Sequence, residues 1–313
     1  MFVPGLRLSE LFYTEAVEPL LREHFGAVTH SAARIGAGSE VLGFDTERSA
    51  DHEWGPRLQL FLSPEDGRGK EIVAMLADHL PKWFHGYPTN FVSTGEDHIR
   101  QMQVTDGPVY HRVDVTDLNT WFSDHLGFDP RGPVTASQWL ATPTQTLAEA
   151  TGGAVFHDGL NQLVKVRSRL TWYPDGVWRQ VLARLWLALA EEEAFVGRCG
   201  EVGDELGSAV VATRQVRQLM RLCLVMARRY PPYSKWLGSA FAQCRPELVP
   251  VLTAVVAATS WRKRERLLAA AYEAVAESHN TLGLTTWVDP ATRHYHDRPF
   301  LVLRAERFAE ALG

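Results

Sequence analysis

The segment from Ile35 to Leu62 holds the residues whose types and spacing could support catalysis. It contains Gly38-Ser39, then eleven residues, then Asp51-His52-Glu53. On an extended strand alternate side chains point to the same side, so Asp51 and Glu53 are expected roughly 6–7 Å apart at their Cα atoms. Two such carboxylates can share a divalent cation, and Mg²⁺ typically takes one or two carboxylates together with substrate phosphates and water.

A glycine-serine turn ahead of the acids would supply the phosphate-binding half of such a site. Gly38 permits close backbone approach, and the Ser39 hydroxyl with N–H groups at the start of a following helix can hold a phosphate. Arg48 and Ser49 precede the acids closely enough to touch a phosphate as well. The alternative for both residues is a solvated loop position.

Asp114 is a third candidate acid, because it lies between Val113 and Val115 in the strand-like run Tyr110–Val115. A strand beside the first acids would bring its carboxylate next to theirs. It could then bind a second metal ion or accept the proton of an attacking hydroxyl, and the sequence leaves both roles open.

The motif is short, so an ordinary solvated strand face is the competing interpretation. Gly-Ser pairs begin at Gly38, Gly207 and Gly238, and of these only the first precedes two acids at the required spacing. A strand-like run follows these acids, and Asp114, between Val113 and Val115, comes later in a second run. This is the order that a site of two adjacent strands requires, and it favours the metal site over the solvated strand face.

These residues resemble the signature of the nucleotidyltransferase superfamily, in which Gly-Gly or Gly-Ser is followed, after a spacer of roughly nine to thirteen residues, by two acids flanking one position. Gly38, Ser39, Asp51 and Glu53 match, and Asp114 corresponds to the third carboxylate. The resemblance implies an Mg²⁺-dependent enzyme that moves a nucleoside monophosphate, with AMP from ATP favoured, onto a hydroxyl of a small molecule and releases pyrophosphate.

The layout is similar to that of the antibiotic nucleotidyltransferases, which place a helical domain after the catalytic one. In that family a helical-domain lysine reaches the nucleotide phosphates, and Lys235 is the corresponding candidate, with a solvated position beside Trp236 as the alternative. The whole chain also resembles a bacterial family of uncharacterised nucleotidyltransferase-like proteins.

Two other functions fit the same resemblance. One is a protein-modifying relative that transfers AMP to a protein hydroxyl. The other is a non-catalytic, nucleotide-binding regulatory module, because His52 stands where relatives usually carry an aliphatic residue and Glu53 where many carry Asp.

The surrounding pattern predicts an α+β protein of two domains. Helical spacing in Ser9–Phe25, behind a Ser9 cap, and in Glu71–Leu80 alternates with the strand-like runs Arg57–Leu62 and Tyr110–Val115. These elements predict a small mixed-sheet catalytic domain over residues 1–132.

After the Gly- and Pro-rich stretch Leu126–Pro133, long helical patterns dominate. They cover Val177–Phe195, Ala209–Arg229 and Trp261–His279. We therefore expect a helical, substrate-binding bundle domain over residues 133–313.

Composition restricts the partners of the chain. Its 313 residues carry a net charge of −5, which argues against a broad nucleic-acid surface. Three cysteines without CxxC spacing, the absence of an export signal and the lack of an apolar run of membrane-spanning length predict a cytoplasmic protein without membrane contacts. The acceptor and the oligomeric state do not follow from the sequence.

Overall fold

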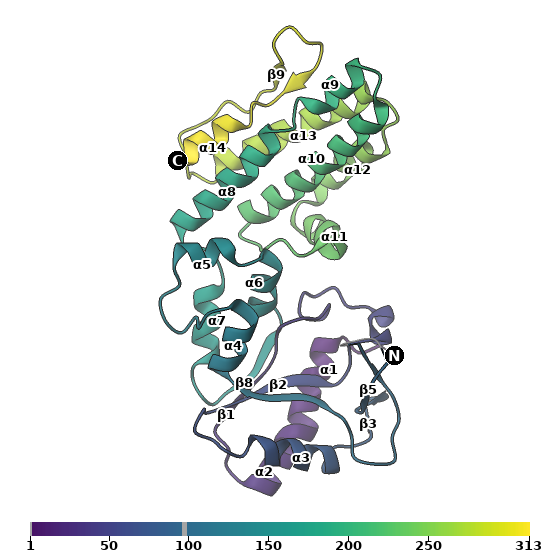
Figure 1. The fold of residues 1–313 in the computed structure, drawn as a ribbon, viewed down its shortest axis with the longest axis vertical. Coiled ribbons are helices and arrows are strands. Elements are labelled where there is room, and N and C mark those ends of the chain that lie inside the picture. Colours follow the sequence, from purple (N-terminus) through teal and green to yellow (C-terminus); the bar gives the residue numbers. More distant parts are fainter. Residues whose placement is uncertain (1, 96–98) are drawn as a thin grey trace. The chain divides into compact units, whose positions relative to one another are not determined.

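A computed structural model describes residues 2–95 and 99–313 and confirms an α+β fold (Figure 1). The chain forms two compact units. The first comprises the residues up to Gln138 together with Thr146–Thr171, and the second comprises Trp139–Gln145 and Trp172–Gly313. The sequence predicts a single boundary, after residue 132. In the structure each unit consists of two separate segments of the chain, because Trp139–Gln145 belongs to the second unit and Thr146–Thr171 to the first.

The first unit is built on a four-stranded sheet in the order β7-β2-β1-β8. Its strands are β1 (His30–Arg34), β2 (Arg57–Leu62), β7 (Arg112–Asp117) and β8 (Ala154–Asp158). β1 is antiparallel to both β2 and β8, and β2 is parallel to β7. The strand predicted at Arg57–Leu62 is confirmed, and the one expected from Tyr110 begins two residues later.

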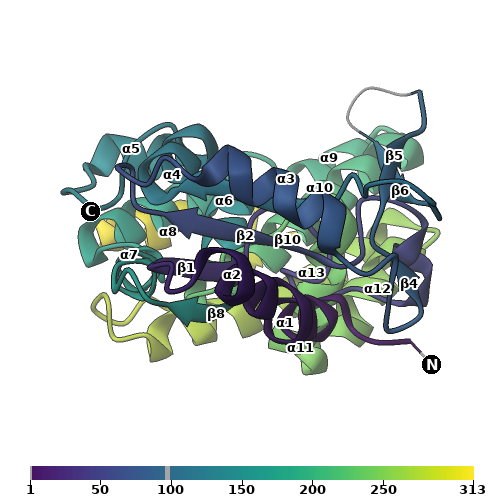
Figure 2. The ribbon, with the colours of Figure 1, turned by 90° about the horizontal axis from the view of Figure 1, so that it is seen from below.

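One face of this sheet is apolar and forms the core of the unit with the first helices. Ala32, Leu58, Leu60 and Val113 belong to this buried cluster, as does Leu76 of the third helix. The elements against this face are α1 (Gly5–Phe12), a π-helical turn (Tyr13–Val17), α2 (Glu18–Phe25) and α3 (Gly69–His79) (Figure 2). The helix predicted near Glu71–Leu80 is confirmed as α3.

The expected Ser9 cap of the first helix is wrong. The helix begins at Gly5 after Pro4, and Ser9 is buried within α1. Proline sets the backbone angle at the helix entrance, so the helix begins earlier than the polar residue suggested.

The opposite face of the sheet carries α4 (Leu118–Leu126), where Trp121 packs edge-on against Phe61 of β2 at 6.2 Å between ring centroids. The remaining described elements of the region up to residue 171 are short. They are η2 (Glu47–Asp51), β3 (Trp83–Phe84), β4 (Tyr87–Pro88), β5 (Phe91–Ser93), β6 (Arg100–Met102), α5 (Ala136–Ala141), α6 (Thr144–Thr151) and α7 (Leu163–Leu170).

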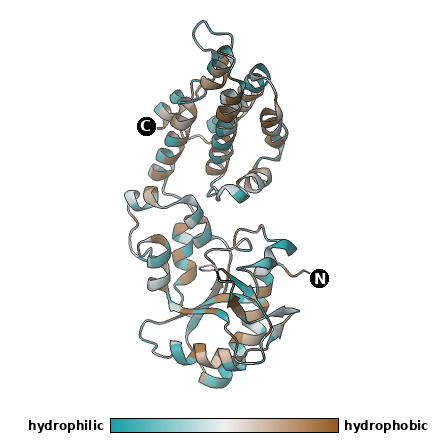
Figure 3. Ribbon diagram, turned by 45° about the vertical axis from the view of Figure 1, so that its right-hand side comes forward, coloured by the Kyte–Doolittle hydropathy of each residue, from teal (hydrophilic) through white to brown (hydrophobic). Residues whose placement is uncertain are grey.

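The second unit is mainly helical, and its amphipathic helices carry both polar and apolar residues (Figure 3). Long helices lie close to each of the three predicted ranges, so those predictions are confirmed. The elements are α8 (Asp175–Ala190), α9 (Phe195–Glu201), α10 (Glu205–Met226), α11 (Ser234–Cys244), η3 (Pro246–Leu248), α12 (Val249–Ala257), α13 (Trp261–Thr281), α14 (Glu306–Leu312) and the hairpin of β9 (Arg293–His294) with β10 (Leu301–Val302). Across residues 2–95 and 99–313, none of the helices combines the length and the hydrophobicity needed to cross a bilayer.

Candidate functional site

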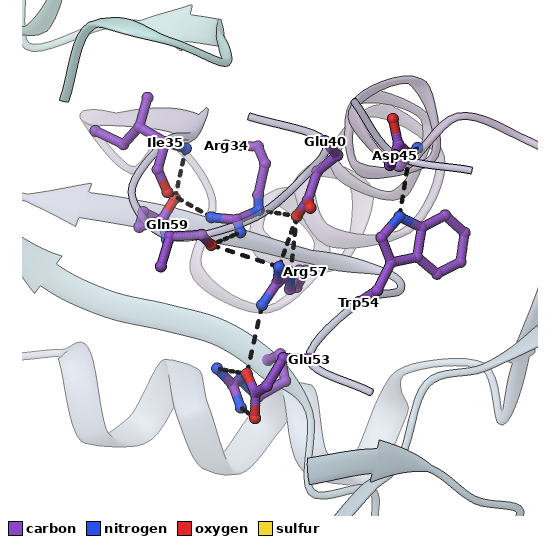
Figure 4. Close-up of polar contacts among 11 residues, drawn as sticks. Arg34, Ile35, Glu40, Asp45, Glu53, Trp54, Arg57 and Gln59 are labelled. Atoms are coloured by element: carbon purple, nitrogen blue, oxygen red, sulfur yellow. Dashed lines mark hydrogen bonds and ion pairs between the residues drawn. The ribbon is translucent and has the colours of Figure 1, made fainter. Parts of the chain in front are cut away.

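A buried cluster of three charged side chains lies where β1 and β2 meet the turn after β1 (Figure 4). Oε1 of Glu40 accepts hydrogen bonds from Arg34 Nε at 2.8 Å and from Arg57 Nη2 at 2.7 Å and Nε at 3.1 Å. The other two guanidinium nitrogens of Arg34 donate to the backbone carbonyls of Ile35 and Ala37. Glu40 thus fixes the orientation of two arginines from different strands.

Electrostatics keep this cluster ionised at neutral pH. Burial by itself would raise the pKa of Glu40, but the charges of Arg34 and Arg57 outweigh burial and lower it. Burial, together with the charge of Arg34, lowers the pKa of Arg57 to about 10 in spite of Glu40. The cluster therefore has one negative and two positive charges, an excess that suits an anion.

Position 38 has no room for a side chain, because the buried charged groups of the cluster lie directly beside it. A Cβ atom at this position would lie 2.6 Å from both Arg34 Nη2 and Glu40 Oε2. These atoms belong to buried ion-paired groups, so they have little room to move away. The glycine of the predicted motif therefore has a packing role beside the arginines.

A polar cavity of about 200 Å³ lies beside the cluster. In the parallel register of β2 and β7, Arg57 is opposite Arg112 and Gln59 is opposite Asp114. Paired residues point to the same face of a sheet, and these four side chains line the cavity with Arg34. Asp114 is exposed, and among the residues that the structure describes its carboxylate forms no hydrogen bond or ion pair, so it is available to a ligand.

Glu53 also lines the cavity, where it is bound by arginines. Its carboxylate pairs with Arg112 through Nη2 at 3.0 Å and Nη1 at 3.2 Å, and with Arg57 Nη1 at 3.5 Å. Oε1 also accepts the backbone N–H of Arg100 at 2.9 Å. The next residue, Trp54, is buried and donates its indole N–H to Asp45 at 3.1 Å, which anchors this part of the chain.

The expectation that Asp51 and Glu53 share one face of a strand is wrong. Asp51 ends the short 3₁₀ helix η2, and Glu53 has a left-handed backbone conformation with φ of +44°. Gly55 and Pro56 separate both residues from β2, which begins at Arg57.

Asp51 does not line the cavity described above. Its carboxylate lies 2.8 Å from Nδ1 of the neighbouring His52 and 4.0 Å from Arg48. Ser49 and Thr46 form a reciprocal cap at the start of η2. The structure therefore keeps Arg48, Ser49 and Asp51 together on a separate short helix.

The predicted Gly38-Ser39 turn is present, but the helix expected to follow it is not. The Phe44 N–H donates to the Ser39 carbonyl at 2.9 Å and the Gly43 N–H to the Glu40 carbonyl at 3.2 Å, which closes a tight turn. The residues of this stretch that line the cavity are Arg34, Ile35, Gly36 and Ala37, which precede the motif.

Lys235 lies in the first turn of α11 in the helical unit. Its ammonium is 4.9 Å from the ring centroid of Trp236, a cation–π contact. Lys235 is thus an exposed lysine beside a tryptophan, as in the alternative interpretation. A contact of Lys235 with nucleotide phosphates stays a prediction.

The aromatic part of the cavity comes from α4. Trp121 and His125 both line it, and their rings stack with 4.7 Å between centroids. Burial lowers the pKa of His125, against the opposing effect of Glu149. His125 is therefore largely neutral at pH 7, and its ring adds a flat, uncharged surface.

The sequence reasoning missed the arginines of the site. A signal was present, because Arg57-Leu58-Gln59 and Arg112-Val113-Asp114 both alternate polar with apolar residues. On half-buried strands such alternation directs the polar side chains to one face. The alternation that places Asp114 on the polar face places Arg112 there as well.

The three predicted metal ligands, Asp51, Glu53 and Asp114, do not form one group in the described part of the chain. Within residues 2–95 and 99–313, no group of three or more His, Cys, Asp or Glu side chains is placed to hold a metal ion. The cavity brings together two of the three predicted carboxylates, Glu53 and Asp114, without Asp51.

Comparison with known proteins adds a family match for part of the chain. No curated protein matches it. The match covers residues 139–237, from α5 to the start of α11. It includes Lys235, whereas every residue that lines the cavity precedes it. This part of the chain is similar to the family described as Domain of unknown function (DUF4037).

Proposed function

We propose that the protein is a nucleotidyltransferase that binds a nucleoside triphosphate, with ATP favoured, in the cavity between β2, β7 and α4. It transfers the nucleoside monophosphate to a hydroxyl of a small molecule and releases pyrophosphate. The observation that carries the proposal is the pairing of Arg57 with Arg112 and of Gln59 with Asp114 across two parallel strands. This pairing brings two arginines, whose chemistry suits phosphate, into one cavity with an Asp114 carboxylate that no other described residue holds by a hydrogen bond or ion pair.

The arginines support the phosphate-binding part of the proposal. Arg34, Arg57 and Arg112 all line the cavity, and guanidinium groups bind phosphate oxygens through paired hydrogen bonds. Glu40 orients two of them before any ligand arrives, which lowers the entropy lost on binding. Such preorganised charges also stabilise the negative charge that develops on a leaving pyrophosphate.

The number and type of carboxylates in the cavity fit the ligands that a protein usually supplies to Mg²⁺. Mg²⁺ usually takes one or two carboxylates from the protein and its remaining ligands from phosphates and water. Asp114 and Glu53 are the residues that would hold it, and Glu53 must first leave its arginine partners. When bound, the metal would neutralise phosphate charge.

Asp114 also has the chemistry of a general base. Its carboxylate faces the cavity without a competing hydrogen bond from the described residues, so it can accept the proton of an acceptor hydroxyl. The stacked pair of Trp121 and His125 offers a flat surface to an aromatic base. A small acceptor and a cytoplasmic location remain part of the proposal.

The test is pyrophosphate release by the full chain with ATP and Mg²⁺ across a panel of small hydroxyl compounds. Asp114→Asn should lower kcat by about a hundredfold, the usual contribution of a general base. The matched control is Asp124→Asn, which removes one exposed charge from α4 outside the cavity. Equal activity of the two variants would refute the role of Asp114.

A second candidate is a nucleotide-binding regulatory module without catalysis. It is favoured by one observation: both oxygens of Glu53 are bound to Arg112, and Asp51 lies outside the cavity. ATP binding by calorimetry without pyrophosphate release for any acceptor would favour this candidate, whereas turnover would favour the transferase.

A further inference from the structure

We propose that the Glu53 carboxylate occupies the place in the cavity that a substrate phosphate takes, so that Glu53 competes internally with the phosphate. The inference rests on the phosphate-binding part of the proposed function and concerns the regulation of that same site. Its basis is the set of donors that converge on this carboxylate.

Arg112 contacts both oxygens of this carboxylate. Its Nη1 donates a hydrogen bond to Glu53 Oε1 at 3.2 Å, and its Nη2 forms an ion pair with Oε2 at 3.0 Å. A guanidinium can likewise contact two oxygens of one phosphate. The group that holds the carboxylate therefore also has the chemistry to bind a phosphate.

Two further donors complete the arrangement. Arg57 Nη1 lies 3.5 Å from Oε2, and the backbone N–H of Arg100 lies 2.9 Å from Oε1. The donors thus come from β2, β6 and β7, and Glu40 holds Arg57 in place independently of Glu53. Loss of the Glu53 carboxylate would leave Arg57 in the orientation set by Glu40 and would remove the acidic partner of Arg112.

Glu53 is the partner that can move. Its side chain is 30% exposed, against 8% for Arg57 and 21% for Arg112. Its φ of +44° is a left-handed conformation that non-glycine residues adopt at a cost of roughly 1–2 kcal/mol. A partly exposed side chain can rotate to solvent about its own side-chain bonds, while Glu40 keeps Arg57 in place.

This arrangement couples phosphate binding to the second role of Glu53. In the proposed function the same carboxylate helps to hold the metal, which it can do only after it leaves the arginines. A phosphate that displaces it therefore favours the metal-binding position, and a metal in turn favours the phosphate, since coupling between two ligands is reciprocal. With Glu53 on the arginines, the affinity of the cavity for phosphate is lowered.

The test is calorimetric titration of the full chain with inorganic pyrophosphate in a chelator, so that no metal contributes. Glu53→Gln should bind pyrophosphate about tenfold more tightly than the wild type, because the competing charged bonds are lost. Glu53→Gly should behave alike, since glycine suits the left-handed backbone and keeps the variant folded. Thermal unfolding of both variants checks that they fold.

The matched control is Glu47→Gln, which removes one exposed negative charge on η2 outside the cavity. It should leave the affinity unchanged, which separates direct competition from a general charge effect. A further variant, Glu53→Gln combined with Arg112→Met, should lose the gain. The inference is overturned if both Glu53 variants bind pyrophosphate no more tightly than the wild type, or if Glu47→Gln gains as much.

The outcomes separate this inference from the transferase proposal. Tighter pyrophosphate binding by the Glu53 variants, with no turnover by the wild type, supports internal competition and refutes the transferase. Turnover by the wild type without a gain in the variants refutes internal competition alone. An absence of pyrophosphate binding by all folded variants, together with no turnover by the wild type, overturns both.

Discussion

Arg57 donates to Glu40 at 2.7 Å, in a place where the two side chains are only 8% and 2% exposed. The carboxylate comes from the turn after β1 and the guanidinium from β2, so the bond ties the turn to the sheet. Because Arg34 shares the same oxygen, a single residue of the turn compensates two buried positive charges.

Glu40→Gln should therefore destabilise the first unit strongly. Glutamine keeps the shape of the side chain but removes the counter-charge of Arg34 and leaves Arg57 with only the longer contact to Glu53 at 3.5 Å. Breaking a buried pair costs about 3–5 kcal/mol. Urea unfolding with far-UV circular dichroism measures the loss. Glu10→Gln, which breaks the exposed pair with Arg7, is the control and should change stability by less than about 1 kcal/mol.

Gly38→Ala should also weaken this cluster. The added Cβ would meet Arg34 Nη2 and Glu40 Oε2 at 2.6 Å, so at least one ion-paired group must shift. Overpacking of this kind costs about 1–3 kcal/mol. Gly176→Ala in α8, where the Cβ meets nothing within 4 Å, is the comparison, and an equal effect of the two changes would contradict the proposed packing role.

Asp114→Asn and Asp51→Asn should differ in their effect on turnover. Asp114 lines the cavity, whereas Asp51 pairs with His52 outside it. We expect kcat/KM to fall by about a hundredfold or more for Asp114→Asn and by less than about tenfold for Asp51→Asn. A larger effect of Asp51→Asn would show that η2 rearranges to bring this acid to the substrate.

The helical unit should lose stability in acid because of His279. This buried residue accepts the indole N–H of Trp186 at 3.1 Å, and burial lowers its pKa from 6.5 to about 4. A depressed pKa means that the neutral form is favoured in the fold, so its stabilising effect is present above pH 6.5 and is lost as the pH falls toward 4.

The expected loss from His279 between pH 8 and pH 5 is about 2 kcal/mol of unfolding free energy. Urea unfolding of the wild type and of His279→Gln at both pH values measures it. Glutamine can still accept the indole N–H but does not titrate, so the variant should lose about that much less between the two pH values. Identical pH dependence of both proteins would contradict this role of His279.

The fold class followed from local patterns. The period of apolar residues predicted α3, α8, α10 and α13, and the alternation in Arg57–Leu62 predicted β2. These signals depend on which residues face a core, and that information is contained in neighbouring positions of the chain. The strand position predicted for Asp51 and Glu53 was wrong, because the turn-forming pair Gly55-Pro56 separates them from β2.

Local patterns were enough to predict the α+β class and the long helices, and the polar alternation at residues 57–59 and 112–114 is visible in the chain itself. They did not predict that Gln59 lies opposite Asp114, or that Thr146–Thr171 joins the first unit through the pairing of β8 with β1. Nor did they predict that Glu40 lies between two arginines. Strand register and buried ion pairs depend on contacts between residues distant in the chain, and no local pattern contains their geometry.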